Sequence, residues 1–347
     1  MSAAAATGKD LVLGLGATGL SVARYLRRAD ANAVFADTRD EPPGIDELNE
    51  IWPDADVVLG KTRMPNNVTR IIVSPGVPDS NELLTKARKK KLEVVSDIEL
   101  FVREAKAPFV AVTGSNGKST VTTLIYYMCL AAGRNVLAGG NLGQPALDLL
   151  DEDQPDIYVL ELSSFQLQRT ENLPAEVAVL LNVSPDHLDW HASVDEYREA
   201  KYRVYREARA AVVNRADETA AEFAEHIKNV VTFGLDEPGE GQYGIRRDEG
   251  IDYLACGDTL LIATHELAMV GASDREYRRD LSVIRRVGQR HAAAVAPAAE
   301  NHALLPDAQV PGRAQEPVCN GEVEFRVVEA REPNTHPPAP VVVREHL

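Results

Sequence analysis

The sequence predicts an α/β protein in which two parallel-sheet domains follow one another. Short β-rich segments alternate with amphipathic segments from residue 10 to about 262. Two units each open with a strand and a glycine-rich turn, and residues 105–108 separate them. The length of 347 residues allows two or three domains that each bury a core.

The alternation assigns the elements in order along the chain. Runs rich in Val, Ile, Leu, Phe and Ala predict strands at 11–13, 33–36, 71–73, 109–113, 158–162, 177–181, 211–213 and 230–233. The amphipathic segments predict helices at 18–28, 80–90, 118–132 and 194–207. We therefore expect one domain at residues 1–106 and a second at 107–271.

The first glycine-rich turn, at residues 14–19, reads Gly-Leu-Gly-Ala-Thr-Gly and lies between a strand and a helix. Such glycines permit a tight turn and a close backbone approach, and the start of the helix can hold an anion. Asp37 ends the second predicted strand, where a carboxylate could meet a ribose. Because any nucleotide diphosphate satisfies this pattern, a Rossmann-like NAD-dependent dehydrogenase stays open as an alternative.

The second turn is more specific. Residues 110–120 read Val-Ala-Val-Thr-Gly-Ser-Asn-Gly-Lys-Ser-Thr, a strand followed by a glycine loop and a helix start. Backbone N–H groups of such a loop surround phosphate oxygens, Lys118 supplies a charge for the β- and γ-phosphates, and the Ser119 hydroxyl can reach Mg²⁺. Val112 stands where the full P-loop pattern has glycine, so the loop is a shortened variant. The second domain is therefore predicted to be of the P-loop ATPase type.

Carboxylate and imidazole groups follow the later strands of this second unit. Glu161 ends an apolar strand, and His187 lies in the loop after the next strand, where doubly wound sheets bind ligands. We interpret both as parts of the nucleotide site. The other histidines in this unit, His191, His226 and His265, are expected to lie at the surface.

The composition excludes several classes of protein. With 53 acidic against 37 basic side chains, the net charge of −16 argues against nucleic-acid binding. No segment is apolar enough for membrane insertion and none resembles a signal peptide. The three cysteines lie far apart and fit a reducing compartment, so we expect a cytoplasmic protein.

A series of short motifs resembles the Mur ligase family. They are residues 16–19, 37–39, 74–76 and 96–101 of the first unit, and 113–120, 139–143, 161–166, 182–189 and 199–201 of the second. Each motif is modest by itself, but the series is specific and covers about residues 10–271. Within the family, the chain is most similar to members that add D-glutamate to UDP-N-acetylmuramoyl-L-alanine.

The resemblance implies an ATP-dependent, amide-forming ligase of peptidoglycan precursor synthesis, acting as a monomer. The muramoyl-alanine carboxylate would attack the γ-phosphate of ATP to form an acyl phosphate, from which the amine of D-glutamate would displace phosphate. Such a reaction depends on positioning and on metal ions.

The resemblance also implies roles for individual residues. Lys118, His187 and Lys201 would act in catalysis. The ATP phosphates would contact Gly114, Ser115, Asn116, Gly117, Lys118, Ser119 and Thr120. The UDP-muramoyl-alanine substrate would contact Ala17, Thr18, Asp37, Thr38, Ser74, Gly76, Asn141 and Ser163. Mg²⁺ would be held by Ser119, Glu161, His187 and Lys201, the last as a carbamate that turns a cation into an anion.

The resemblance stops near residue 272, before the family's carboxyl-terminal ligase domain, which we expect to be missing. Residues 272–347 contain ten arginines and no lysine, and eight of the twenty prolines fall in the last 51 residues. This composition predicts an atypical, disordered tail, and a reading-frame change after about residue 272 would explain it. An inactive fragment that binds nucleotide and UDP-sugar therefore stays open beside a working ligase.

Overall fold

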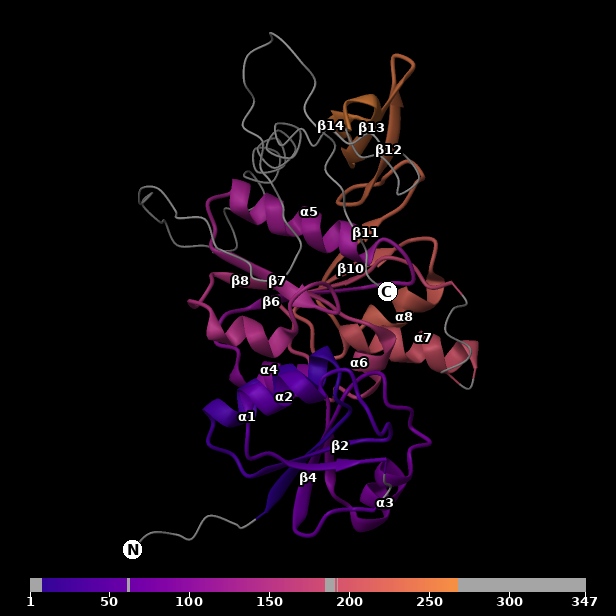
Figure 1. Cartoon of the computed structure of the whole chain (residues 1–347). Helices are drawn as coiled ribbons and strands as arrows, with labels where there is room; N and C mark the ends of the chain where they lie inside the picture. Colours follow the sequence, from indigo (N-terminus) through magenta and orange to yellow (C-terminus); the bar gives the residue numbers. More distant parts are fainter. Residues whose placement is uncertain (1–7, 61–62, 185–190, 192, 268–347) are drawn as a thin grey trace, which may run out of the picture.

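The computed structural model describes residues 8–60, 63–184, 191 and 193–267, and it confirms the predicted α/β class. Two sheets follow one another, the first from the indigo part of the chain and the second from the magenta and orange parts (Figure 1). The predicted tail, residues 272–347, lies outside the described residues.

The first sheet is wholly parallel, with the strand order β3-β2-β1-β4-β5. Its strands are β1 (Lys9–Leu13), β2 (Ala33–Asp37), β3 (Asp56–Leu59), β4 (Val68–Val73) and β5 (Glu93–Val95). Its helices are α1 (Ala17–Arg28), α2 (Ile45–Ile51) and α3 (Glu82–Lys90). The strand order reverses between β1 and β4, so the loops after these two strands form the crevice where ligands bind in such sheets.

The second sheet has the strand order β14-β13-β12-β11-β10-β9-β6-β8-β7. Its strands are β6 (Phe109–Thr113), β7 (Val136–Gly140), β8 (Ile157–Glu161), β9 (Val177–Leu180), β10 (Ala210–Asn214), β11 (Asn229–Phe233), β12 (Tyr243–Asp248), β13 (Ile251–Cys256) and β14 (Thr259–Ala263). The pairs from β7 to β12 are parallel, and β12, β13 and β14 pair antiparallel. The order reverses at β6, which lies between β8 and β9.

Helices connect and cover the strands of this second part. They are α4 (Asp97–Glu104), α5 (Lys118–Ala131), α6 (Ser164–Gln168), α7 (Val194–Tyr202) and α8 (Glu218–Ala224), with the 3₁₀ turns η1 (Ala146–Asp151), η2 (Arg203–Tyr205) and η3 (Thr264–Glu266). The predicted helix at 194–207 was too long, because the α-helix ends at Tyr202 and continues as the tighter turn η2.

All eight predicted strands are confirmed. Each predicted range lies inside the observed strand or extends past it by one residue, and the observed strands are β1, β2, β4, β6, β8, β9, β10 and β11. Some of the elements that were not predicted are very short or contain glycine. Strand β5 has three residues, α6 has five, and β7 ends in two glycines, so these three carry no long periodic pattern.

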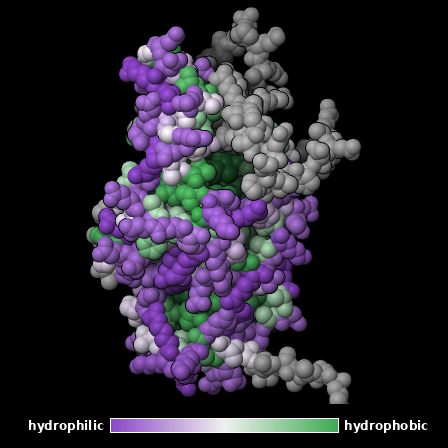
Figure 2. Space-filling model, turned by 180° about the vertical axis from the view of Figure 1, so that it is seen from behind, coloured by the Kyte–Doolittle hydropathy of each residue, from purple (hydrophilic) through white to green (hydrophobic). Residues whose placement is uncertain are grey.

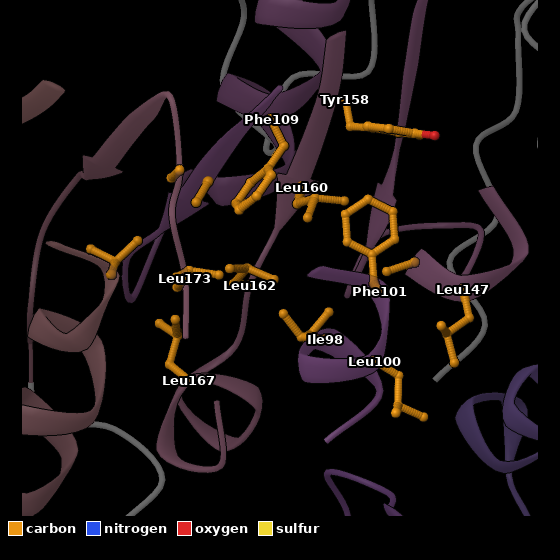
Figure 3. Packing of buried hydrophobic residues seen from close by; sticks show 14 of the residues in the cluster. Ile98, Leu100, Phe101, Phe109, Leu147, Tyr158, Leu160, Leu162, Leu167 and Leu173 are labelled. Carbon is orange, nitrogen blue, oxygen red and sulfur yellow. The ribbon is translucent and has the colours of Figure 1, made fainter. Parts of the chain in front are cut away.

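The two sheets share one hydrophobic core. The largest buried cluster includes Val12 and Phe35 of the first sheet together with Leu160 of the second. Helix α4 joins them, because the Phe101 ring packs edge-on against Tyr158, with ring centroids 5.0 Å apart (Figure 3). Burial of this shared cluster fixes the first sheet relative to the second.

Polar contacts support the same junction. Arg24 of α1 donates through Nη2 to Asp148 Oδ2 of η1 at 2.6 Å and through Nε to Oδ1 at 3.1 Å. The Ser21 hydroxyl donates to the same Asp148 Oδ1 at 2.8 Å. A bidentate guanidinium–carboxylate pair fixes orientation as well as distance, so α1 is locked in direction against the second domain.

The surface seen in Figure 2 is mostly hydrophilic, with apolar side chains gathered in two areas of that face. The charged residues make up 26% of the sequence, an ordinary share for a globular protein. None of the helices in the described ranges combines the length and the apolar character needed to span a bilayer.

Candidate nucleotide and substrate site

The P-loop sequence forms the predicted strand–loop–helix unit. Strand β6 ends at Thr113, and α5 begins at Lys118 with Gly117 as its N-cap residue at φ +80°. Glycine suits this left-handed conformation. A Cβ on Gly114 would lie 3.0 Å from the Leu181 Cβ, so a side chain there would press against the segment after β9. The first turn of α5 presents N–H groups that have no partner within the helix, an arrangement that favours anions.

Asn182 holds the loop from the neighbouring strand. Its backbone carbonyl accepts from the Ser115 N–H at 2.9 Å, and its Oδ1 accepts from the Asn116 N–H at 2.9 Å. Lys118 is half-buried, and its Nζ donates to the Ser115 carbonyl at 3.1 Å. Ser119 and Thr120 are exposed at the helix start. The lysine charge is therefore held over the loop, and the two hydroxyls are open to a ligand.

Glu161 ends β8 beside this loop and is 2% exposed. Its Oε1 accepts from the Asn141 Nδ2 at 2.8 Å, while its Oε2 is buried with no hydrogen-bond partner among the described residues. Gly140 makes the Asn141 contact possible, since it has φ +102° and a Cβ there would lie 2.5 Å from the Glu161 carbonyl oxygen. A buried carboxylate oxygen with an open coordination position suits a hard cation such as Mg²⁺.

Lys201 comes to the same place from α7. Its side chain is 2% exposed, and its Nζ donates to the Gly114 carbonyl at 2.8 Å, although the two residues are 87 positions apart. The Nζ also lies 4.8 Å from the ring centroid of Tyr197, whose hydroxyl is 2.8 Å from the Ser115 Oγ. Helix α7 therefore packs against the P-loop, and Lys201 is enclosed at its base.

His187 was predicted as a metal ligand, and it lies outside the described residues. His191, expected at the surface, is instead 1% exposed. Its Nε2 is 3.0 Å from the Ser164 Oγ, and its ring stacks on Phe165 with centroids 5.6 Å apart. The surface prediction for His191 was wrong, because α6 and α7 pack together around this side chain. His226 and His265 are exposed, as expected.

The first glycine turn is tightly packed. Gly14 has φ +100°, and a Cβ on Gly19 would lie 2.0 Å from the Gly14 carbonyl oxygen. The Ser74 hydroxyl donates to that same oxygen at 3.0 Å, so the turns after β1 and β4 touch each other. The loops after these two strands therefore meet at the point where the strand order reverses.

Asp37 is buried beneath this turn. Its Oδ2 accepts from the Leu15 N–H at 2.8 Å, and its two oxygens accept from the Arg39 guanidinium at 2.9 and 2.8 Å. Burial raises the pKa of Asp37, but the hydrogen bonds from Arg39 and Leu15 outweigh it and lower the pKa to about 2. Because both oxygens are already engaged, Asp37 braces the turn, and this weakens the dehydrogenase alternative, which needs a carboxylate on the ribose.

The other residues implied for the UDP-linked substrate lie around these turns. Ala17, Thr38 and Gly76 are exposed, and Thr18 is half-buried. A cavity of about 280 Å³ lies between the start of α1 and Pro145 of the second domain. The structure thus brings the first-domain residues to one end of their sheet, with an open volume that reaches the second domain.

Helix α6 was not predicted. It begins beside Ser163 and carries Gln166, which links Ser163 to Asp97 at the start of α4. Ser163 is its N-cap, with its Oγ accepting from the Gln166 N–H and the Gln166 Oε1 accepting from the Ser163 N–H. The Ser-x-x-Gln spacing is the usual sequence signal for such a capping box. The same Gln166 donates through Nε2 to Asp97 Oδ2 at 3.3 Å, a contact with no sequence signal.

Asp97 opens α4 at the domain junction and is 2% exposed. Its Oδ1 is buried without a hydrogen-bond partner in the described part of the chain. Burial raises the pKa of Asp97 to about 6, although the hydrogen bond from Gln166 acts in the opposite direction. The carboxyl group therefore keeps its proton to a higher pH in the folded protein than the ordinary value of about 4 in an unfolded chain.

We expect this group to make the fold more stable as the pH falls from 7 to 5. Between about 6 and 4 the folded state binds the proton and the unfolded state does not, so protonation favours folding by an amount on the order of 1 kcal/mol. Asp97→Asn removes the titration. Urea unfolding of the wild type and of Asp97→Asn at pH 7 and pH 5 measures the free energy of unfolding of each. If the difference between the two proteins is the same at both pH values, the expectation is contradicted.

Two known sequence profiles match the chain. Residues 8–96 match the description "Mur ligase MurD-like, N-terminal domain", and residues 112–265 match "Mur ligase middle domain". The UDP-N-acetylmuramoylalanine–D-glutamate ligase of Nitrosococcus oceani is 43% identical over 264 residues, which are 76% of this chain and 58% of that protein. The ligase of the same name from Legionella pneumophila strain Paris is 43% identical over 266 residues, 75% of this chain and 60% of that one.

The fold is also similar to a solved structure. The UDP-N-acetylmuramate:L-alanyl-gamma-D-glutamyl-meso-diaminopimelate ligase from Neisseria meningitides superposes with a TM-score of 0.50 and 15% sequence identity, covering 84% of this chain and 94% of that chain. The chain described here spans about three fifths of the length of the curated relatives it matches.

Proposed function

The chain belongs to the Mur ligase family, and we propose that its activity is the ATP-dependent addition of D-glutamate to UDP-N-acetylmuramoyl-L-alanine. Members of this family are ATP-dependent ligases that form amide bonds, and the curated relatives at 43% identity are named for this reaction. The observation that supports it best is the buried Glu161 Oε2, which has no hydrogen-bond partner among the described residues. This oxygen belongs to a strand that ends beside the P-loop, in which Lys118 supplies a positive charge.

ATP would bind at the start of α5. The N–H groups of the first turn and the Lys118 ammonium would contact the phosphates, while Ser119 and Thr120 offer exposed hydroxyls. Lys118 needs only to leave the Ser115 carbonyl to reach a phosphate oxygen, because its present bond is to a neutral acceptor. A charge-assisted bond to phosphate is stronger than the one it would replace.

The residues fit a bound Mg²⁺. Glu161 supplies an uncommitted buried oxygen, and Ser119 supplies a hydroxyl at the helix start. We propose His187 and a carbamylated Lys201 as further ligands. A bound Mg²⁺ would stabilise the negative charge that develops on the transferred phosphoryl group.

The UDP-linked substrate would lie between the two sheets. The turns at residues 14–19 and 74–76, with Thr38 above Asp37, would hold the uridine diphosphate. Asn141 and Ser163 would contact the muramoyl-alanine part. Asn141 also holds Glu161 through Nδ2, so one amide would connect the substrate carboxylate with the metal ligand. Our proposed domain limits, 1–106 and 107–271, place this substrate at the domain junction.

The proposed reaction has two steps. A carboxylate oxygen of the muramoyl-alanine attacks the γ-phosphorus of ATP, and ADP leaves with the bridging oxygen. The amine of D-glutamate then attacks the acyl carbon, phosphate leaves, and the ammonium proton is released. The residues described here bind and orient the reactants, as positioning and charge stabilisation dominate phosphoryl transfer. We place the reaction in the cytoplasm and expect the chain to act as a monomer.

The decisive experiment combines the purified chain with ATP, Mg²⁺, UDP-N-acetylmuramoyl-L-alanine and D-glutamate, and measures phosphate release. For the ligase we expect multiple-turnover release of phosphate that requires both UDP-N-acetylmuramoyl-L-alanine and D-glutamate. Binding of UDP and ADP in calorimetry without turnover would instead identify a nucleotide-binding fragment. Binding of NADH, seen by its fluorescence, with no binding of UDP would overturn the proposal in favour of a dehydrogenase.

A further inference from the structure

Arg169 follows α6 in the second domain and reaches into the first. Its side chain is 7% exposed. Its guanidinium donates to the backbone carbonyls of Ser74 at 3.1 Å, Pro75 at 3.4 Å and Val77, and it also contacts Asp79 Oδ1 at 3.1 Å. One side chain of the second domain therefore gathers the carbonyls of the loop after β4.

The inner side of this loop is held by its own domain. The Ser74 N–H donates to the Leu13 carbonyl at 2.9 Å, and the Ser74 hydroxyl donates to the Gly14 carbonyl at 3.0 Å. The Val77 N–H closes the turn by donating to the Ser74 carbonyl at 3.1 Å. The outward carbonyls are the ones that Arg169 binds, so the position of the loop depends on both domains.

The other end of α6 carries Ser163. This helix has five residues and is capped at its start by Ser163, with a capping box that fixes the Ser163 hydroxyl. At a rise of 1.5 Å per residue, its length is about 8 Å. Arg169 and Ser163 are thus at opposite ends of one short rigid element.

We propose that Arg169 is a positioning residue for the UDP-linked substrate. It fixes the loop at residues 74–76 at a set distance from Ser163. The two binding regions are thereby spaced to match the uridine diphosphate and muramoyl-alanine parts of one substrate. The inference rests on the proposed function, in which the loop and Ser163 contact two ends of one substrate. Arg169 itself touches only protein groups among the described residues.

The geometry requires arginine. A guanidinium presents five donors in a rigid plane and can bind several carbonyls and a carboxylate at once, whereas an ammonium has three donors on a flexible stem. Removing the guanidinium takes a donor from the half-buried carbonyls of Ser74, Pro75 and Val77, which costs free energy and lets the loop relax. The hydrogen bonds of Arg169 described above go to the loop after β4 and not to the P-loop, so we expect ADP binding to be unaffected by its replacement.

The test compares Arg169→Met, Arg169→Lys and the control Arg203→Met. Arg203 is a suitable control because its guanidinium also binds a carbonyl at the end of α6, that of Gln168, but not the loop. Calorimetry measures the affinity for UDP and, separately, for ADP with Mg²⁺, and thermal melting checks the fold. Where turnover is present, KM for the UDP-linked substrate is compared with KM for ATP.

We expect Arg169→Met to weaken UDP binding by about 10- to 100-fold, as small misplacements of binding groups do, and to leave ADP binding unchanged. Arg169→Lys should lie between the two, and it carries the test if the Met variant does not fold. Unchanged UDP affinity in the Arg169 variants, or an equal loss of UDP affinity in Arg203→Met, overturns the inference about Arg169 and leaves the proposed function standing. Absence of UDP binding by the wild-type chain overturns the proposed function together with the inference.

Discussion

Glu161→Gln is expected to abolish the response of the protein to Mg²⁺ and to lower ligase turnover by about 10²- to 10³-fold. The amide keeps the size of the side chain, and its oxygen can still accept the bond from Asn141. It replaces the buried, uncommitted Oε2 with an NH₂ group that repels a cation. The change therefore removes one charge and one metal ligand with little change in packing.

The effect on Glu161 can be measured without turnover. A ligand that binds only the folded state raises the melting temperature with its concentration. We expect Mg²⁺ with ADP to raise the melting temperature of the wild-type chain and to leave that of Glu161→Gln nearly unchanged. Glu176→Gln is the control, because Glu176 lies before the amino end of β9, whereas Glu161 lies at the carboxyl end of β8 in the same parallel sheet, and Glu176 pairs with Arg209. An equal Mg²⁺ response in the wild type and Glu161→Gln would exclude Glu161 as a ligand.

Lys118→Met should lower phosphate release by a similar factor, about 10²- to 10³-fold, for a different reason. Methionine keeps most of the aliphatic stem of the half-buried lysine and removes the only charge that the P-loop sequence itself supplies between residues 110 and 120. The β- and γ-phosphates lose a charge-assisted bond that strengthens as negative charge develops. Weakened ADP binding should accompany the lower rate.

We expect Lys118→Met to affect binding at the second domain and not at the first. UDP binding, which uses the first sheet, is expected to be the same in Lys118→Met as in the wild type. Lys228→Met, at an exposed position before β11, controls for the loss of one positive charge from the surface. Equal phosphate release by Lys118→Met and the wild type would contradict the placement of ATP at this loop.

Much of the site follows from local sequence. The roles proposed for Gly114, Gly117, Lys118 and Ser119 depend on a few adjacent backbone angles, and the structure has the strand, loop and helix where the spacing predicts them. The same holds for the turn at residues 14–19, where Gly19 is required by its approach to the Gly14 carbonyl. Such requirements act within one turn, so a single sequence reveals them.

Contacts between distant segments could not be predicted in this way. His191 resembles a loop histidine in the sequence, but packing between α6 and α7 buries it. Asp37 has the position of a ribose ligand, yet its oxygens accept from the Leu15 N–H, 22 positions away, as well as from the nearby Arg39. Arg169 has no periodicity or motif around it, and its partners are 90 to 95 positions away.

The sequence by itself determined the α/β class, the two glycine turns, the places of Lys118 and Glu161 in the proposed nucleotide site, and the family to which the chain belongs. These depend on backbone conformation and on residue types at fixed short spacing. Only the tertiary structure decided which buried polar atoms lack a hydrogen-bond partner among the described residues, and that side chains such as Arg24 and Arg169 bridge the two sheets. Burial and hydrogen-bond partners are properties of the packed chain. The burial of Glu161 Oε2 and the contacts of Arg169 could therefore be identified only from the tertiary structure.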